Sequence, residues 1–183
     1  ATGSQTEVGS SDNTYEITWD NANKDNYSVK ENLGTLTVKE NDEEIILTAA
    51  SASKVYDGTA LSRNEVEASG LPEGFSIEAS ASGKQVNVGE SANTVDDDYI
   101  IKNAAGEDKT AYFTNVTKKD GTLTVSKREV TITTGTAEKA YDGTALSNDE
   151  VSIEGLVENE SVSLTATGSQ TEVGSSDNTY EIT

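Results

Sequence analysis

The 183-residue sequence has no histidine, cysteine or methionine, and it contains one proline and ten aromatic residues (one Trp, seven Tyr and two Phe). Without histidine and cysteine there is no Ser-His-Asp or Cys-His nucleophile, no imidazole or thiolate metal site and no disulfide framework. A glycosidase with paired carboxylates is the remaining enzyme class, but ten aromatic residues are few for a sugar-binding cleft. We therefore predict no catalytic activity and no cofactor.

Positive charge is also scarce. Thirteen Lys and Arg residues stand against 33 Asp and Glu residues, which gives a formal net charge of −20 at pH 7. Phosphate backbones and anionic membranes bind proteins largely through clusters of Lys and Arg. The chain also lacks a run of about 20 apolar residues, the length that spans a bilayer. The sequence therefore predicts neither nucleic acid nor membrane as a partner.

The composition favours strands over helices. Apolar residues make up 33% of the chain, whereas Ser and Thr together number 44. Period-two alternation recurs, and no segment shows the sustained i, i+3, i+4 apolar spacing of a helix. Strands are expected at Ile45–Ala52, Glu65–Ser69, Phe75–Ser82, Lys84–Val88, Tyr99–Asn103, Ala111–Val116 and Thr122–Ser126. This pattern predicts an all-β fold of small antiparallel Ig-like β-sandwich domains in tandem, with β-grasp as the alternative.

Internal repetition is the strongest signal in the chain. Residues 1–18 and 166–183 share the sequence ATGSQTEVGSSDNTYEIT, at an offset of 165. A diverged copy lies within this period, because KVYDGTALS at Lys54–Ser62 matches KAYDGTALS at Lys139–Ser147 at an offset of 85. GTLTV occurs twice as well, at Gly34–Val38 and Gly121–Val125. These periods exceed the 20–50 residues of solenoid repeats, so each unit is expected to bury a small core of its own.

The offsets divide the chain into three parts. Residues 1–44 are predicted to be the C-terminal part of a repeat unit A, residues 45–129 a complete unit B, and residues 130–183 the N-terminal part of the next A. Incomplete units expose strand edges, so we expect neighbouring copies of the same repeat as partners, head to tail. Two alternatives are covalent completion within a longer array, and a different frame in which Tyr15–Trp19 is the first strand of a domain.

The repeated landmarks resemble a known family. Each YDGTALS segment is followed by Gly-Leu and by V-G-x-S-x-N-T, and the units close on GTLTV. This combination resembles the YDG and MBG-type tandem repeat domains of bacterial cell-surface adhesins. The resemblance implies a non-catalytic structural repeat in the stalk or fibre of an extracellular protein at the bacterial cell wall. It leaves open a weak, multivalent module that binds host glycan or mucin.

The repeated motif itself comprises Tyr56, Asp57 and Gly58 in the first copy and Tyr141, Asp142 and Gly143 in the second. A binding site would use the tyrosine as a stacking platform for sugars and the aspartate as an acceptor for hydroxyl groups. A tight turn explains the same residues, because Asp accepts backbone N–H groups, Gly supplies a positive φ and Tyr covers the end of the core. We favour the structural turn.

Two acidic clusters are candidate calcium sites, since Ca²⁺ prefers six to eight oxygen ligands. They are Asp42, Glu43 and Glu44, at the junction of A and B, and Asp96–Asp98 within B. Neither matches the spaced D-x-[DN]-x-[DN]-G loop, and adjacent carboxylates on a strand point to opposite faces. We predict solvated loops without bound metal.

Lys54 and Lys139 occupy matched positions before the two Tyr-Asp-Gly motifs. A lysine in such a place is a candidate for an isopeptide bond to an Asn or Asp. That reaction requires a neutral amine in an apolar pocket beside a carboxyl group. We predict no cross-link.

Overall fold

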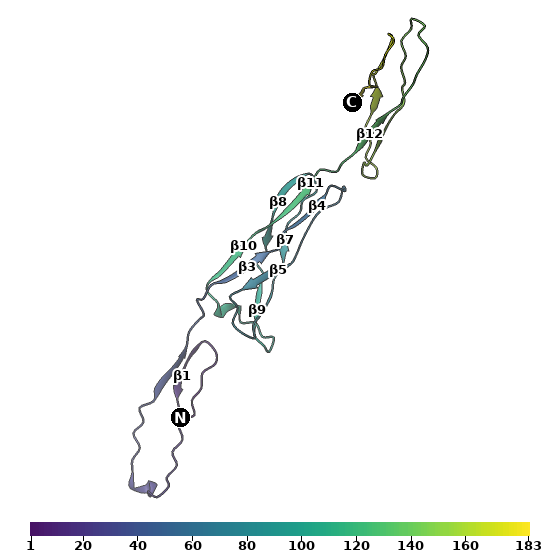
Figure 1. The fold of residues 1–183 in the computed structure, drawn as a ribbon. Helices are drawn as coiled ribbons and strands as arrows, with labels where there is room; N and C mark the ends of the chain where they lie inside the picture. The colour runs from purple at the N-terminus through teal and green to yellow at the C-terminus, as the bar shows by residue number, and fades with distance from the viewer. The chain divides into compact units, whose positions relative to one another are not determined.

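A computed structural model describes residues 1–183 and confirms the all-β class (Figure 1). It contains fifteen strands and two three-residue 3₁₀ helices, and it has no α-helix. The strands are β1 (Gly9–Asn13), β2 (Gly34–Val38), β3 (Ile45–Ala49), β4 (Ala52–Val55), β5 (Val66–Ser69), β6 (Ser76–Glu78), β7 (Ala81–Ser82), β8 (Gly89–Val95), β9 (Ile100–Lys102), β10 (Val116–Lys119), β11 (Gly121–Ser126), β12 (Thr131–Thr134), β13 (Val151–Glu154), β14 (Leu164–Ala166) and β15 (Tyr180–Ile182). The 3₁₀ helices are η1 (Lys24–Asn26) and η2 (Thr110–Tyr112).

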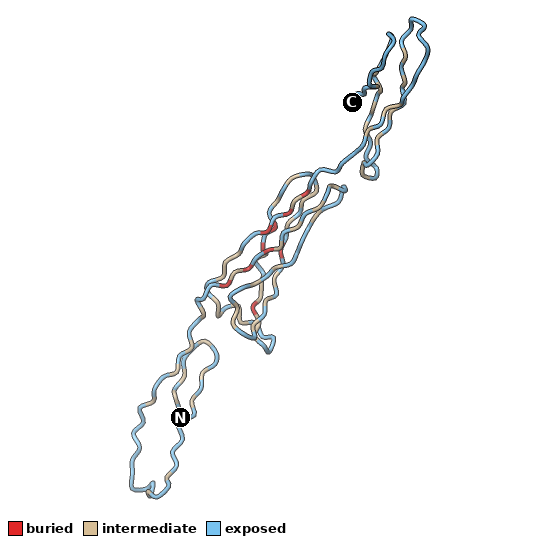
Figure 2. Tube along the Cα trace, viewed as in Figure 1, coloured by how far each residue is buried: buried red, intermediate tan, exposed pale blue.

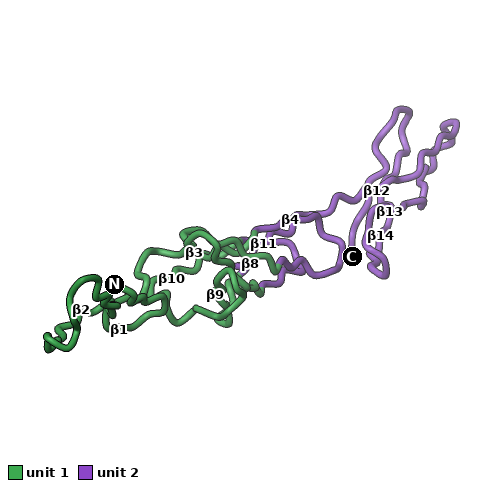
Figure 3. The backbone as a smooth tube through the Cα atoms, turned by 90° about the horizontal axis from the view of Figure 1, so that it is seen from below, with its two compact units in different colours: residues 1–50, 64–82, 94–121 green, residues 51–63, 83–93, 122–183 purple.

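The chain separates into two compact units, which are coloured in Figure 3. Unit 1 comprises Ala1–Ala50, Asn64–Ser82 and Thr94–Gly121, and unit 2 comprises Ser51–Arg63, Gly83–Asn93 and Thr122–Thr183. Each unit is therefore assembled from segments that are distant in the sequence.

Strand β3 is the centre of the main sheet of unit 1, whose order is β10-β3-β5. It pairs with β5 in antiparallel orientation and with β10 in parallel orientation, with Val116 opposite Ile45. Its sequence IILTA alternates in the period of two that a strand requires, so Ile45, Leu47 and Ala49 all face the core and are at most 2% exposed.

The core of unit 1 is small. Ile101, on β9, is fully buried beside the three β3 residues, and Ala81 and Val95 complete the buried cluster. Phe75 and Phe113 pack against this cluster and meet edge to face, with ring centroids 5.3 Å apart. Few large side chains are available, so the contribution of each one to stability is correspondingly large.

A separate hairpin lies at the start of unit 1. Strands β1 and β2 pair in antiparallel register, with Gly9 opposite Val38 and Asn13 opposite Gly34. Trp19 and Tyr27, in the long connection between these strands, stack with ring centroids 5.4 Å apart. No residue of this hairpin is buried.

In unit 2, β4 pairs with β11 in parallel orientation, with Leu123 opposite Ala52. The four-stranded sheet to which they belong has the order β4-β11-β8-β7. Leu123 and Val125, on β11, are 0% and 1% exposed. The remaining strands of unit 2 form two isolated antiparallel pairs, β12 with β13 and β14 with β15.

Burial is confined to the middle of the sequence, as Figure 2 shows. Every buried residue lies between Ile45 and Val125, and none lies in residues 1–44 or 130–183. The strands of those two terminal segments therefore have one or both faces exposed.

Two of the expected strands were wrong. Lys84–Val88 is not a strand, because the side-chain amide of Gln85 donates to the carbonyl of Asn87 and bends the segment before Gly89. Ala111–Val116 is also not a strand: η2 occupies its beginning, and β10 starts only at its last residue. Strand β8 was not expected at all.

Candidate functional site

The first Tyr-Asp-Gly motif forms a turn that Lys54 closes. The Lys54 Nζ donates to Asp57 Oδ1 at 2.6 Å and to Thr59 Oγ1 at 2.8 Å. Asp57 Oδ1 also accepts a hydrogen bond from the backbone N–H of Thr59 at 2.9 Å. Gly58 has φ = +78°, a conformation that residues with a Cβ rarely adopt.

The second motif repeats this geometry. The Lys139 Nζ donates to Asp142 Oδ1 at 2.9 Å and to Thr144 Oγ1 at 2.6 Å, and Asp142 accepts the Thr144 N–H at 2.9 Å. Gly143 has the same φ of +78°. The two copies therefore share a turn built by five consecutive kinds of residue, Lys-x-Tyr-Asp-Gly-Thr, with x not involved.

Charge holds these turns together. The hydrogen bond from Lys54, followed by those from Thr59, lowers the pKa of Asp57 far below its ordinary value, and Lys139 and Thr144 do the same to the pKa of Asp142. Each aspartate is therefore ionised at neutral pH and paired with its lysine. An isopeptide bond needs a neutral carboxyl group to react, and this ion pair stabilises the charged one.

The tyrosines of the two motifs differ in their surroundings. The Tyr56 hydroxyl donates to Glu160 Oε1 at 2.5 Å, and this bond raises the pKa of Tyr56. A Cβ added to the neighbouring Gly58 would lie 3.0 Å from Val157. Tyr141, in contrast, is 62% exposed. In the first copy the motif thus contacts the loop between β13 and β14, and in the second copy the corresponding surface is open.

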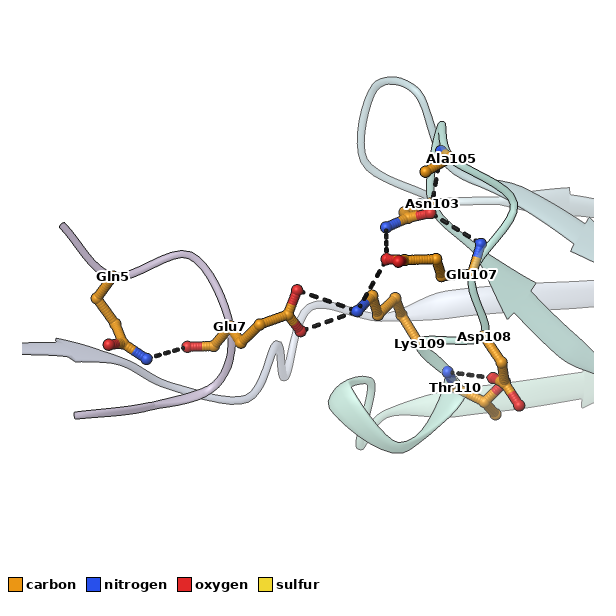
Figure 4. A network of polar contacts seen from close by, with 8 residues as sticks. All are labelled: Gln5, Glu7, Asn103, Ala105, Glu107, Asp108, Lys109 and Thr110. Atoms are coloured by element: carbon orange, nitrogen blue, oxygen red, sulfur yellow. Dashed lines mark hydrogen bonds and ion pairs between the residues drawn. The ribbon is translucent and has the colours of Figure 1, made fainter. Parts of the chain in front are cut away.

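A second polar cluster joins the loop before β1 to the loop after β9 (Figure 4). The Lys109 Nζ donates to both carboxylate oxygens of Glu7, at 3.0 and 2.9 Å, and lies 3.2 Å from Glu107 Oε2. Asn103 donates to the same oxygen of Glu107 at 2.9 Å. The contact with Glu7 raises the pKa of Lys109, and the contacts with Lys109 and Tyr112 lower the pKa of Glu7.

The Glu7–Lys109 contact was not predicted from the sequence. Glu7 lies within the duplicated 18 residues, but Lys109 lies in the part of B that has no counterpart in A. One signal was available, because a lysine is conspicuous in a chain with 33 acidic and 13 basic residues.

The acidic clusters are divided among separate partners. Glu44 Oε1 accepts from Thr117, and the backbone N–H of Glu43 donates to Asn41, while the Asp42 carbonyl accepts from Asn115. In the second cluster, Asp96 accepts from Ser80 and Ser82, and Asp97 pairs with Lys118 at 2.6 Å. The structure contains no group of three or more acidic side chains arranged to hold a metal ion.

No protein-family model, curated protein or solved structure matches the chain. None of its helical segments has the length and apolar character needed to cross a membrane. The geometry described above therefore carries the functional argument.

Proposed function

We propose that the chain is a structural repeat of the stalk or fibre of an extracellular bacterial surface adhesin and that it has no catalytic activity. The observation that carries the proposal is repetition. Residues 1–18 recur without change at residues 166–183, and the Lys-x-Tyr-Asp-Gly-Thr turn recurs with the same contacts. Selection for length or multivalency favours such arrays.

The pairing of the first and last strands of residues 45–129 supports a load-bearing role. Strands β3 and β4 pair in parallel orientation with β10 and β11, respectively. Tension applied through the two ends of this segment pulls parallel neighbours in opposite directions along their length. The ladder hydrogen bonds then share the load and must break together, whereas an antiparallel hairpin pulled at its open end loses them one at a time.

At the level of fold, we propose tandem Ig-like sandwiches, with β-grasp as the alternative. Residues 45–126 supply two sheets of three and four strands, the number of strands in a small sandwich. The buried residues belong to these strands, and the flanking segments have none.

The polar chemistry also supports a structural role. The carboxylates whose pKa values are lowered accept hydrogen bonds from Lys, Ser, Thr, Asn or Tyr within turns and ion pairs, as Asp57 and Asp108 illustrate. Stabilised, ionised carboxylates of this kind hold loops in place, whereas general acid catalysis at neutral pH requires a raised carboxyl pKa.

Single-molecule force spectroscopy tests the load-bearing role. Because the chain has no cysteine, handles can be attached at cysteines introduced at Glu44 and Lys127, or at Ser76 and Lys102, which are opposite each other in the antiparallel pair β6–β9. We expect a clearly higher unfolding force for the first pair. Equal forces would contradict the proposal. Antibody labelling of intact source cells tests the extracellular location, and absence of labelling without permeabilisation would exclude it.

Glycan or mucin binding is the alternative function. The stacked Trp19–Tyr27 pair favours it, because Tyr27 is 61% exposed and a flat aromatic face suits a sugar ring. A glycan array tests this alternative, with Trp19→Ala as the matched control. Specific binding that Trp19→Ala abolishes would establish the binding function, and hydrolysis of any glycan would contradict both proposals.

A further inference from the structure

The C-terminal part of unit 2 contains an open trough of about 760 Å³. Its walls include Thr136, Lys139 and Tyr141 on one side and Gly174 and Asn178 on the other. By the offset of 85, residues 137–140 correspond to β4, and residues 174–178 correspond to the first five residues of β8. In the sheet order β4-β11-β8, the strand that lies between these two is β11. The trough therefore occupies the place of a missing strand.

The same chain contains a strand with the sequence that is missing. β2 and the first five residues of β11 both read GTLTV. In β11, Leu123 and Val125 are almost completely buried, whereas their counterparts in β2, Leu36 and Val38, are half-exposed. β2 thus carries apolar side chains that its own hairpin does not bury.

Glycine gives independent evidence for a neighbour of β2. A Cβ added to Gly121, the first residue of β11, would lie 2.5 Å from the carbonyl oxygens of Ala49 and Ala50. At Gly34, the first residue of β2, an added Cβ would meet nothing within 4 Å. The close approach that requires glycine in β11 is absent around β2, although the sequence is the same.

The segment GSSDN shows the effect of the missing neighbour directly. At residues 9–13 it lies beside β2 and forms strand β1, whereas at residues 174–178 the identical sequence has no such neighbour and forms no strand. Residues 137–140 likewise form no strand, although their counterpart β4 is one.

We propose that β2 of a second copy of this chain inserts into the trough, where residues 174–178 of the first copy replace the identical residues 9–13 of the second. The register follows from β4 and β11, which places Leu36 opposite Ala137, Thr37 opposite Glu138 and Val38 opposite Lys139. Residues 29–32 of the second copy then lie parallel to β12, as β10 lies beside β3.

The exchange is balanced on one side and favourable on the other. Residues 166–183 reproduce every contact that residues 1–18 make with β2, because the two sequences are identical. The loops are also prefolded alike, since the amides of Gln5 and Gln170 each donate at 2.8 Å to the carbonyl two residues later. The two parallel strand pairings are additional, and they make the exchanged state the more stable one.

The exchange also places Glu172 at Lys109 of the second copy, in the position of Glu7. Val173 is 87% exposed in the single chain, whereas its counterpart Val8 is half-buried. Val8 lies at a pocket of about 600 Å³ lined by apolar groups such as Pro72, Phe75 and Phe113. The motif of the first copy would enter this region with Tyr141, as Tyr56 meets the loop containing Val157 and Glu160.

This inference goes beyond the stalk proposal, because self-assembly in dilute solution requires neither a cell surface nor a ligand. Failure of the assembly leaves the force and labelling experiments unaffected, and failure of those experiments leaves the assembly standing.

Sedimentation and disulfide trapping of the full chain test the proposal. We expect oligomers whose size grows with protein concentration. Because the chain has no cysteine, mixing Thr37→Cys with Glu138→Cys should yield a disulfide-linked dimer under mild oxidation, since paired strands bring Cα atoms within disulfide reach. Mixing Thr35→Cys with Glu138→Cys, two residues out of register, is the control and should yield much less dimer.

Three further variants distinguish strand exchange from non-specific association. Gly34→Ala should abolish assembly without changing the single chain, because its Cβ has open space until a neighbour arrives. Glu172→Gln should weaken assembly about two- to five-fold by loss of an exposed ion pair, whereas Glu7→Gln should strengthen it by weakening the competitor. A chain that stays monomeric at all concentrations, trapping only within one chain in a Thr37→Cys/Glu138→Cys double variant, or equal effects of Glu7→Gln and Glu172→Gln would each overturn the proposal.

Discussion

At the scale of the residue, the aspartates of the two turns make stability depend on pH. The pKa of Asp57 is lowered in the folded chain by Lys54 and Thr59, while the unfolded value is about 3.9. A lowered folded pKa stabilises the fold above the unfolded value, and this stabilisation is lost as the pH falls through the folded value. The turn therefore contributes fully at neutral pH and progressively less below about pH 4.

Asp57→Asn should lower the melting temperature at pH 7 by a few degrees, because the ion pair and its Thr59 contacts are lost. At about pH 2 the difference from the unmodified chain should shrink, since the stabilisation from the aspartate is already reduced there. Thermal unfolding followed by circular dichroism at both pH values measures this. Asp142→Asn is the matched comparison, and a difference for Asp57→Asn that grows toward low pH would contradict the assignment.

Gly121 is required for space and not for its backbone angle. Gly121→Ala should lower the free energy of unfolding by about 1–3 kcal/mol, the usual cost of overpacking, because its Cβ would meet two backbone carbonyls at 2.5 Å. Denaturant titration measures the change, at a protein concentration low enough to keep the chain monomeric. Gly34→Ala is the control and should have no effect under those conditions.

At the scale of the element, β3 and β11 bear most of the stability, because they hold the large side chains that are fully buried. Leu47→Ala should lower the free energy of unfolding by about 2–5 kcal/mol, since Leu47 is 0% exposed. Leu36→Ala, on half-exposed β2, should cost much less in the monomer. Urea titration of both variants checks the order, and equal losses would show that β2 is already covered.

The sequence predicted some elements better than others, and the reason is the apolar pattern. Glu65–Ser69, Tyr99–Asn103 and Thr122–Ser126 are confirmed within one residue by β5, β9 and β11. β8 was missed because its sequence GESANTV is mostly small and polar, and Asn93, not an apolar residue, is one of its buried residues. A strand that buries an amide carries no hydrophobic alternation to detect.

The candidate site was predicted only in its local part. The Asp-Gly turn could be inferred, because Asp57 and Gly58 act on their own backbone. The partners of Tyr56 and Lys109, Glu160 and Glu7, are 104 and 102 residues away, and no local pattern encodes such distances. The duplication indicated which residues recur, and the structure was needed to show what each copy contacts.

At the scale of the whole molecule, the net charge of −20 opposes compaction and self-association. Raising NaCl from about 10 mM to about 300 mM shortens the Debye length from roughly 30 Å to less than 10 Å and screens this repulsion. The exposed ion pairs lose less than the repulsion releases, because each is worth at most about 1 kcal/mol. We expect a higher melting temperature and larger oligomers in the higher salt. Calorimetry and sedimentation measure both, and a fall in either would show that specific ion pairs outweigh the repulsion.

The prefolded loops at Gln5 and Gln170 have a genetic consequence. Each loop takes its shape from its own residues, with the side-chain amide on a nearby carbonyl, so it does not depend on which repeat precedes it. A recombination crossover within the identical 18-residue segments would delete or add 165 residues and leave the same loop at the joint. The gene can thus change the length of the encoded protein in steps of a fixed size, and every resulting product retains folded junctions.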